Sequence, residues 1–323
     1  MRAFLFGAGS SYGTLERCDA QPPLAKDFGA FLSKQSGFAA RYPNLSRAAM
    51  HVEKVLSEIG LVDLWTCLDY YAKLSGADGA LGETPDWLWP AVTELKEQAL
   101  LWLYGRRCDD AGDALPDSAD YTIGDLLQNR VEDGDVVVSF NYDTIVERLA
   151  ARFDRDLRHC DGSPRGFVKF VKPHGSASWP LRPAPSAAIQ GKPLLDSLAE
   201  DMRNNPLVLG AVPIKSELLR EVQACHSTPD VFKAIMHQWE GVVEAIRDAD
   251  ELIVIGYSFP KEDQYGRFLF QEAIRRRGRK PIRIEYYNTI ESGADILETF
   301  ANASAGLELV WKDVVKGPIP GAK

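Results

Sequence analysis

The stretch Val136-Val-Val-Ser-Phe-Asn-Tyr-Asp-Thr144 joins a short apolar run to a pair of polar side chains. Three β-branched residues in succession predict a buried strand. The run then ends in Asn141 and Asp143, which place an amide and a carboxylate two residues apart just beyond the predicted strand. Because such groups are costly inside a core without partners, we interpret them as side chains that face a ligand.

The rest of the chain predicts strands that alternate with helices. Apolar runs predict strands at 2–6, 135–139, 166–172, 252–255, 282–287 and 307–311. Helical patterns fall at 24–33, 144–152, 214–224, 230–248, 262–277 and 291–303. The segment 173–193 is rich in Pro, Ser and Ala without periodicity and predicts a loop. Strands separated by helices indicate an α/β fold with a parallel sheet covered on both faces.

A long helical segment interrupts this alternation. Apolar residues recur at steps of three and four from about residue 45 to 103. We therefore predict a helical insertion subdomain at 38–130 within an α/β domain formed by 1–37 and 131–323. The Trp and Leu residues within 87–103 predict a core or an oligomer surface.

The composition disfavours several classes of protein. The 323 residues are 45% hydrophobic and 26% charged, so the chain can bury a core. Its net charge of −9 gives no electrostatic reason to bind nucleic acid or an anionic membrane. Five cysteines form no C-x-x-C pair, which disfavours a zinc ribbon or a disulfide framework and favours the cytoplasm. The chain has no run of 18 consecutive apolar residues, so we predict no membrane span. The basic run 275–280 suits the end of a helix, where positive charge is favoured.

Small or polar residues follow almost every predicted strand. These segments are Gly7-Ala-Gly-Ser-Ser11, Asn141-Tyr-Asp143, His174-Gly175, Gly256-Tyr-Ser258 and Asn288. Because the carboxyl ends of parallel strands meet at one edge of the sheet, we expect these segments to converge there. The conjunction predicts a ligand site at that edge.

The glycine segments have two interpretations. The dehydrogenase fingerprint G-x-G-x-x-G is missed because the third glycine falls one place late, at Gly13. The first segment then predicts a loop whose exposed N–H groups can meet a pyrophosphate. A simple tight turn explains the same glycines, and turn chemistry equally explains the segment at Gly256.

The polar segments also have structural alternatives. Asn141 and Asp143 are residue types that cap helices, and a helix is predicted from Thr144 onward. A solitary histidine is often structural. His174, however, stands in a turn directly after Pro173, which predicts an imidazole exposed to a cleft.

Taken in order, these segments resemble those of sirtuins. More closely, Ser139-Phe-Asn-Tyr-Asp143, Lys172-Pro-His-Gly-Ser176 and Ile255-Gly-Tyr-Ser-Phe-Pro-x-x-Asp263 are similar to the sirtuin-like domains of bacterial antiphage-defence proteins. The resemblance is carried by short motifs spread over about residues 3–288. It implies a Rossmann-like domain that binds NAD and cleaves its nicotinamide–ribose bond.

The resemblance also implies roles for individual residues. Asn141 and Asp143 would face the nicotinamide ribose and the nicotinamide, and His174 would be the catalytic histidine. The residues that would bind the pyrophosphate and the riboses of NAD are Ala8, Gly9, Ser10, Ser11, Gly256, Ser258 and Asn288.

Two departures from the sirtuin pattern argue against protein deacylation. The chain lacks the spacing of a four-cysteine zinc module, and Pro23-Leu-Ala-Lys-Asp27 stands where sirtuins carry Ile-Pro-Asp-Phe-Arg. We therefore expect an NAD hydrolase that needs no metal and yields nicotinamide and ADP-ribose. The alternatives are an NAD-dependent protein deacylase or ADP-ribosyltransferase, and a non-catalytic sensor of NAD or ADP-ribose. Because unrestrained NAD hydrolysis would be toxic, we expect control by a regulatory or sensor protein partner or by homo-oligomer assembly.

Overall fold

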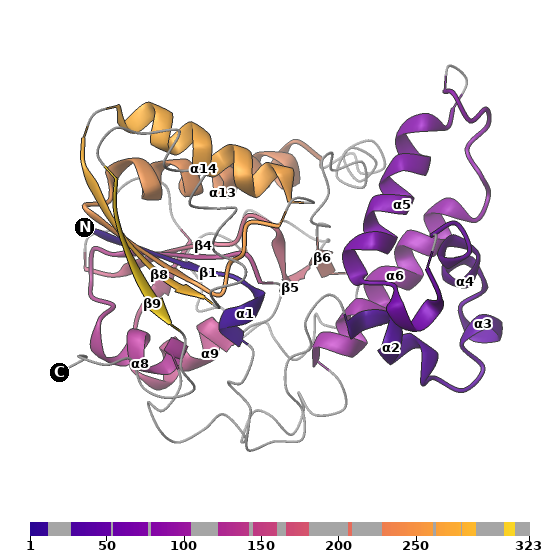
Figure 1. Cartoon of the computed structure of the whole chain (residues 1–323), viewed down its shortest axis with the longest axis horizontal. Coiled ribbons are helices and arrows are strands. Elements are labelled where there is room, and N and C mark those ends of the chain that lie inside the picture. Colours follow the sequence, from indigo (N-terminus) through magenta and orange to yellow (C-terminus); the bar gives the residue numbers. More distant parts are fainter. Residues whose placement is uncertain are drawn as a thin grey trace.

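The computed structural model describes residues 1–11, 27–52, 54–76, 79–104, 122–141, 145–159, 166–180, 206–208, 228–260, 263–278, 280–288 and 307–313. Within these ranges seven strands form one sheet in the order β3-β4-β2-β1-β7-β8-β9 (Figure 1). Every neighbouring pair in this sheet is parallel. The predicted α/β fold, a Rossmann-like parallel sheet with helices on both faces, is confirmed.

The strands of the main sheet lie close to the predicted positions. They are β1 Arg2–Phe6, β2 Val136–Ser139, β3 Leu157–Arg158, β4 Val168–Val171, β7 Glu251–Ile255, β8 Ile282–Asn288 and β9 Leu307–Asp313. Only the two-residue strand β3 was not predicted, because it is too short to carry an apolar pattern.

The described helices fall into two groups. Those of the sheet domain are α1 Ala8–Ser11, α8 Thr122–Asn129, α9 Ile145–Arg152, α13 Thr228–Asp248 and α14 Gln264–Arg277. The others are α2 Phe28–Ser33, α3 Phe38–Arg41, α4 Pro43–Ala49, the 3-10 helix η2 Leu56–Glu58, α5 Leu61–Leu74 and α6 Leu88–Tyr104. The helices predicted at 214–224 and 291–303 lie outside the described residues.

Strand β1 lies at the centre of the sheet, and its apolar side chains point alternately to the two faces. Ala3 and Leu5 pack in the core shared with α13 and α14, whereas Phe4 and Phe6 pack in the core shared with α8 and α9. Figure 1 shows these two pairs of helices on opposite sides of the sheet. All four side chains are completely buried. Successive strand residues point to opposite faces, so a continuous apolar run is what a doubly covered strand requires.

The helices α2 to α6 form a separate unit, called here the helical unit. Its own core includes Phe28, Leu32, Leu45, Leu64, Trp65, Leu68, Trp87, Leu88 and Leu95. The boundaries between the core of the helical unit and the cores of the sheet do not fall at the predicted residues 38 and 130. Helix α2 packs in the helical unit, whereas Ile123 and Leu126 of α8 pack on the sheet.

The prediction of a loop throughout 173–193 is wrong for its first part. Residues Gly175–Pro180 form β5, which pairs antiparallel with β6, Pro206–Val208. The pattern gave no sign of this pair because the two strands are short and separated in sequence, and one of them ends in proline.

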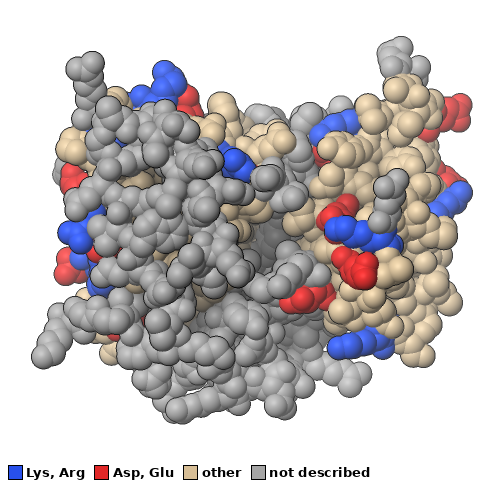
Figure 2. Space-filling model, in the orientation of Figure 1, with Lys and Arg blue, Asp and Glu red and all other residues tan. Residues whose placement is uncertain are grey.

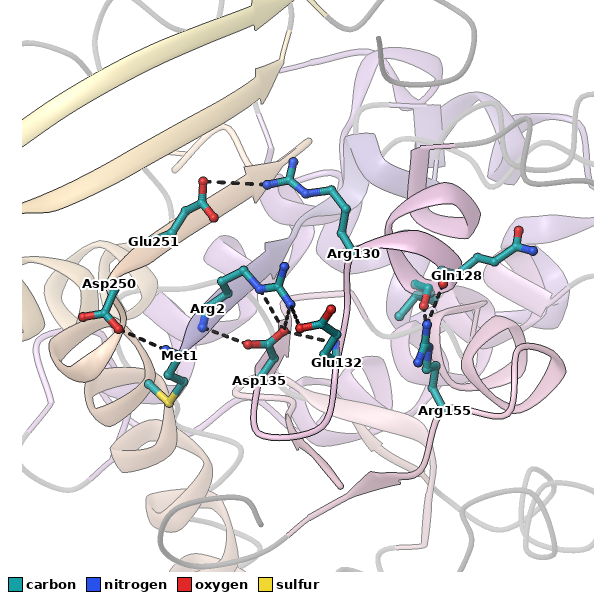
Figure 3. Close-up of polar contacts among 10 residues, drawn as sticks. Met1, Arg2, Gln128, Arg130, Glu132, Asp135, Arg155, Asp250 and Glu251 are labelled. Carbon is teal, nitrogen blue, oxygen red and sulfur yellow. Dashed lines mark hydrogen bonds and ion pairs between the residues drawn. The ribbon is translucent and has the colours of Figure 1, made fainter. Parts of the chain in front are cut away.

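At the amino-terminal edge of the sheet, a network of charged groups joins β1, β2 and β7 (Figure 3). The terminal ammonium of Met1 lies 3.0 Å from an Asp250 oxygen. The Arg2 guanidinium pairs with Asp135 at 2.9 Å and with Glu132 at 2.7 Å. Asp135 is buried and also accepts the amides of Arg2, at 2.9 Å, and of Glu132, at 3.1 Å. This carboxylate therefore fixes where the two central strands begin.

The basic run 275–280 has the structural role expected of it. Arg275 and Arg276 both pair with Glu272 on the exposed side of α14. The Arg277 side chain turns inward instead and donates to the carbonyls of Arg247 and Lys280, at 2.8 and 2.9 Å. It thereby holds the end of α13 against the end of α14.

We expect Asp135→Ala to lower the free energy of unfolding by about 2–4 kcal/mol, because two backbone amides and a guanidinium lose a buried carboxylate. The matched control is Glu132→Ala, which removes an exposed partner of the same arginine and should change stability by less than about 0.5 kcal/mol. Urea unfolding of both variants gives the comparison. Equal losses would contradict the role given to Asp135.

His159 predicts a loss of stability in acid. Burial lowers the pKa of His159 from its ordinary 6.5 to about 3, and the nearby Lys172 charge adds to that effect. Because the folded-state pKa lies below the unfolded value, the unfolded chain takes up the proton first. The stability is thus complete above pH 6.5 and falls as the pH drops toward 3. Over that interval His159→Gln should show a shallower slope of unfolding free energy against pH, by up to about 1.4 kcal/mol per unit. Parallel slopes would show that His159 contributes nothing.

Candidate functional site

The carboxyl ends of β1 and β7 meet at the centre of the sheet, where the connections diverge. The chain after β1 goes on to β2 on one side, whereas the chain after β7 goes on to β8 on the other. Helices α8 and α14 accompany these connections on opposite faces. Ligands of open α/β sheets bind at such a switch point.

The turns after β1 and β7 are held together by backbone hydrogen bonds. The Gly7 amide donates to the Ile255 carbonyl and the Gly9 amide to the Gly256 carbonyl, both at 2.9 Å. The Ser10 amide donates to the Gly7 carbonyl, also at 2.9 Å. The prediction of exposed N–H groups is therefore wrong for Gly9, whose amide bonds to the neighbouring turn, and for Ser10, whose amide bonds within its own turn.

Gly256 has no room for a side chain. Its φ is +59°, and an added Cβ would lie 2.1 Å from the Ser10 nitrogen. An added Cβ on Gly7 would lie 2.4 Å from the Cα of Tyr257. These glycines thus allow close packing of two turns, whatever else they contact. Ala8 and Ser11 belong to α1, and their side chains lie outside the described part of the structure.

Asn141 joins the end of β2 to the turn after β1. Its side-chain nitrogen donates to the Gly7 carbonyl at 3.0 Å and to the Ser10 hydroxyl at 3.4 Å. The Ser10 hydroxyl in turn donates to the same carbonyl at 2.6 Å. Asn141 is buried, and these contacts direct its amide toward β1. Asp143 lies outside the described residues, so its predicted role stays a prediction.

His174 is buried in the turn between β4 and β5, where its exposed fraction is 4%. The prediction of an imidazole exposed to a cleft is therefore wrong. The Phe140 ring meets the imidazole edge to face at 5.4 Å and stacks on the Tyr257 ring at 4.1 Å. The Phe140 ring thus covers the histidine, which no local pattern around Pro173 indicated.

Asp263 is a site residue that the sequence prediction missed. It is completely buried, and its Oδ2 atom lies 3.0 Å from His174 Nε2 and accepts the Tyr257 hydroxyl at 2.7 Å. Its Oδ1 atom accepts the Gly266 amide at 3.1 Å, which caps α14. Burial raises the Tyr257 pKa well above 10, and the Asp263 charge and hydrogen bond add to it. The available signals were its place in the first turn of the helix predicted at 262–277 and at the end of the motif that begins at Ile255.

Lys172 and Glu147 form an ion pair beneath the histidine turn. The Lys172 ammonium lies 2.8 Å from Glu147 and 3.0 Å from the Ser176 hydroxyl, and both charged side chains are almost completely buried. The Lys172 amide donates to Gln238 of α13 at 2.8 Å. The indole of Trp239 donates to the Pro173 carbonyl, also at 2.8 Å. The turn that carries His174 is thus held by Glu147 of α9 and by two residues of α13.

The remaining predicted residues lie near the same edge. Ser258 is exposed, and the next residue, Phe259, has a φ of +48°, which is strained for a bulky side chain. Asn288 donates to the Tyr286 hydroxyl at 2.7 Å, and that hydroxyl donates to the Tyr257 carbonyl at 2.9 Å. The structure therefore brings Gly9, Ser10, Asn141, His174, Gly256 and Asn288 to one edge of the sheet.

Known relatives, metal sites and membrane spans give little further information on the site. Neither the protein-family models nor the curated proteins contain a match to this chain. In the described ranges, no three His, Cys, Asp or Glu side chains are arranged to hold a metal ion. Among the same residues, no helix is long and apolar enough to cross a membrane.

We expect Gly256→Ala to lower the free energy of unfolding by about 2–5 kcal/mol, the sum of a left-handed backbone and a steric overlap with Ser10. Gly37→Ala is the matched control, because Gly37 has a φ of +68° and open space where a Cβ would lie. It should cost only about 1–2 kcal/mol. If urea unfolding gives the two variants the same loss, the close approach of the turns is not what requires the glycine.

Proposed function

We propose that this chain is an NAD hydrolase of the sirtuin-like kind, which releases nicotinamide and ADP-ribose. One observation supports it most. Asn141 directly follows Phe140, whose ring contacts the His174 imidazole, and Asn141 itself bonds to the turn after β1. An amide and an imidazole from neighbouring strands thus lie beside the switch point of a Rossmann-like sheet, where such folds bind nucleotides.

The reaction adds water to C1′ of the nicotinamide ribose, breaks the bond to nicotinamide and releases one proton. Positive charge develops on the ribose as the bond breaks, as in other glycosyl transfers. Asn141 can donate and accept hydrogen bonds, so it suits a ribose hydroxyl or the attacking water. His174 can accept the proton, and a carboxylate at Asp143 would stabilise the developing charge.

The burial of His174 favours a second candidate, a protein that binds NAD or ADP-ribose without turnover. The imidazole is covered by Phe140 and contacts Asp263, and the Asn141 amide is bonded to backbone. In this second proposal the same edge recognises the nucleotide, and the signal passes to a partner. Deacylation and ADP-ribosyl transfer have no observation of their own in their favour.

We further propose that the protein acts in antiphage defence in the cytoplasm, restrained by a sensor protein or by homo-oligomer assembly. The large apolar side chains Met50 and Val55 are 76% and 61% exposed on the helical unit, which suits an assembly surface. Charges of both signs are interspersed among the described residues of the face in Figure 2. That mixture suits a protein partner better than nucleic acid.

The test is to incubate the purified full chain with NAD and to separate the products by chromatography. We expect nicotinamide and ADP-ribose in equal amounts without any peptide. His174→Ala and Asn141→Ala should each lower the rate by about 10²–10⁴-fold, the usual contribution of positioned acid–base groups. The control is His51→Ala, because His51 is an exposed histidine on the helical unit.

Three outcomes separate the candidates. Wild-type rates in folded His174→Ala and Asn141→Ala proteins would rule out the hydrolase site. NAD binding without product, also with the proteins encoded beside it, would favour the sensor. Product that appears only with an added peptide would favour a transferase or deacylase.

A further inference from the structure

A tight turn at the end of β4 carries His174. The Gly175 amide donates to the Lys172 carbonyl at 3.0 Å, and Pro173 takes the second position, as is common in β-turns. Gly175 has a φ of +81°, a left-handed backbone that glycine adopts without strain. The place of His174 therefore depends on what holds the two ends of this turn, Lys172 and Ser176.

The Lys172 ammonium joins both ends of the turn to a helix. It lies 3.0 Å from the Ser176 hydroxyl and 2.8 Å from Oε1 of Glu147, which stands in the first turn of α9. Helix α9 follows β2 and Asn141 in the chain. A single cation thus connects the turn of His174 with the helix that comes after Asn141.

The burial of this ion pair is costly for a contact that adds stability alone. The side chains of Lys172 and Glu147 are 0% and 2% exposed, so both charges have lost their hydration. Desolvation generally offsets the attraction of such a pair, and apolar residues of similar volume are often as stable in its place. What the pair adds over apolar groups is direction, because short charge-assisted hydrogen bonds depend on distance and angle.

A second ion pair on the same strand provides a comparison. Lys169 of β4 lies 3.0 Å from Glu244 of α13, and the Lys169 side chain is also buried. The Glu244 side chain is 33% exposed, so this pair reaches the solvent. It joins β4 to α13 upstream of the turn. The two pairs therefore allow a general effect of ion pairs on β4 to be separated from an effect on the turn.

We propose that Lys172 and Glu147 are positioning residues, whose ion pair holds the His174 turn at a fixed place against α9 and contributes orientation rather than stability. The structural half of this statement, the order of the turn, stands without any reaction. The catalytic half rests on the proposed function, in which the imidazole and the Asn141 amide must keep a fixed relation to the same ribose.

The decisive variant replaces the three polar groups together, as Glu147→Leu/Lys172→Met/Ser176→Ala, and is called the apolar variant. We expect its Tm to lie within about 3 °C of the wild type, because apolar groups replace a desolvated pair. Glu147→Leu alone should lower the Tm by about 5–15 °C, because the ammonium stays buried without its carboxylate. An apolar variant that melts as low as the single one, or that does not fold, would overturn the proposal.

Amide hydrogen exchange of the full chain, read by mass spectrometry, tests the order of the turn. A peptide that covers residues 172–176 should exchange at least about tenfold faster in the apolar variant, because the turn opens locally without the ammonium. The matched control is Lys169→Met/Glu244→Leu, which should leave the exchange of 172–176 as in the wild type. Wild-type exchange at 172–176 in a folded apolar variant would show that the ion pair does not hold the turn.

The kinetics of nicotinamide release test the catalytic half. The apolar variant should lower kcat by about 10–10²-fold, the order expected when a reacting group is displaced by about 1 Å. Its KM should change by less than about threefold, because the groups replaced are buried and do not meet the substrate. The Lys169→Met/Glu244→Leu control should keep the wild-type kcat.

The measurements distinguish the two halves. A wild-type chain that cleaves no NAD would overturn the proposed function, and melting and exchange would still decide whether the ion pair orders the turn. Faster exchange at 172–176 together with a wild-type kcat would overturn the catalytic half alone.

Discussion

The backbone contact between the turns after β1 and β7 is the constraint on which the site depends. Gly9 bonds to Gly256, and a side chain on Gly256 would overlap Ser10. Because the two turns meet without side chains between them, the Gly7 carbonyl is within reach of Asn141 from β2. The same approach sets Tyr257 in place to stack on Phe140. The polar and aromatic groups of the site are therefore arranged around a pair of touching main chains.

The two edges of the sheet use charge in different ways. At the amino-terminal edge, the buried Asp135 pairs with the partly exposed Arg2, which also pairs with the exposed Glu132. At the carboxyl edge, the charged groups Lys172, Glu147 and Asp263 are all buried, and each takes part in a hydrogen bond or ion pair with another side chain. Buried charges of this kind rarely add stability, because desolvation offsets their attraction. At the amino-terminal edge one partner of Asp135 meets water, whereas Lys172 and Glu147 are both enclosed, an arrangement that suits a site that fixes orientation.

Much of the fold was predictable because the strands are short apolar runs with turn residues behind them, as at Val136 to Val138. The convergence of strand ends followed from parallel topology alone. The burial of His174 did not, because Phe140, which covers it and stacks on Tyr257, follows a strand distant in sequence. The pairing of β5 with β6 was not predicted for the same reason, because β5 is a strand only through its pairing with the distant β6. Local pattern thus indicated which residues gather, but not which of them face inward.

The order in which β1 and β7 are translated has a consequence for biosynthesis. Among the described strands of the main sheet, β1 is translated first and is also the central one, and one of its two neighbours, β7, begins only at Glu251. Until that neighbour has been translated, one side of β1 has no partner, while α2 to α6 can already collapse around their own core. Such distant pairing slows folding and leaves an apolar edge open during synthesis. The nascent chain is thus exposed to aggregation for the whole interval between the translation of β1 and that of β7.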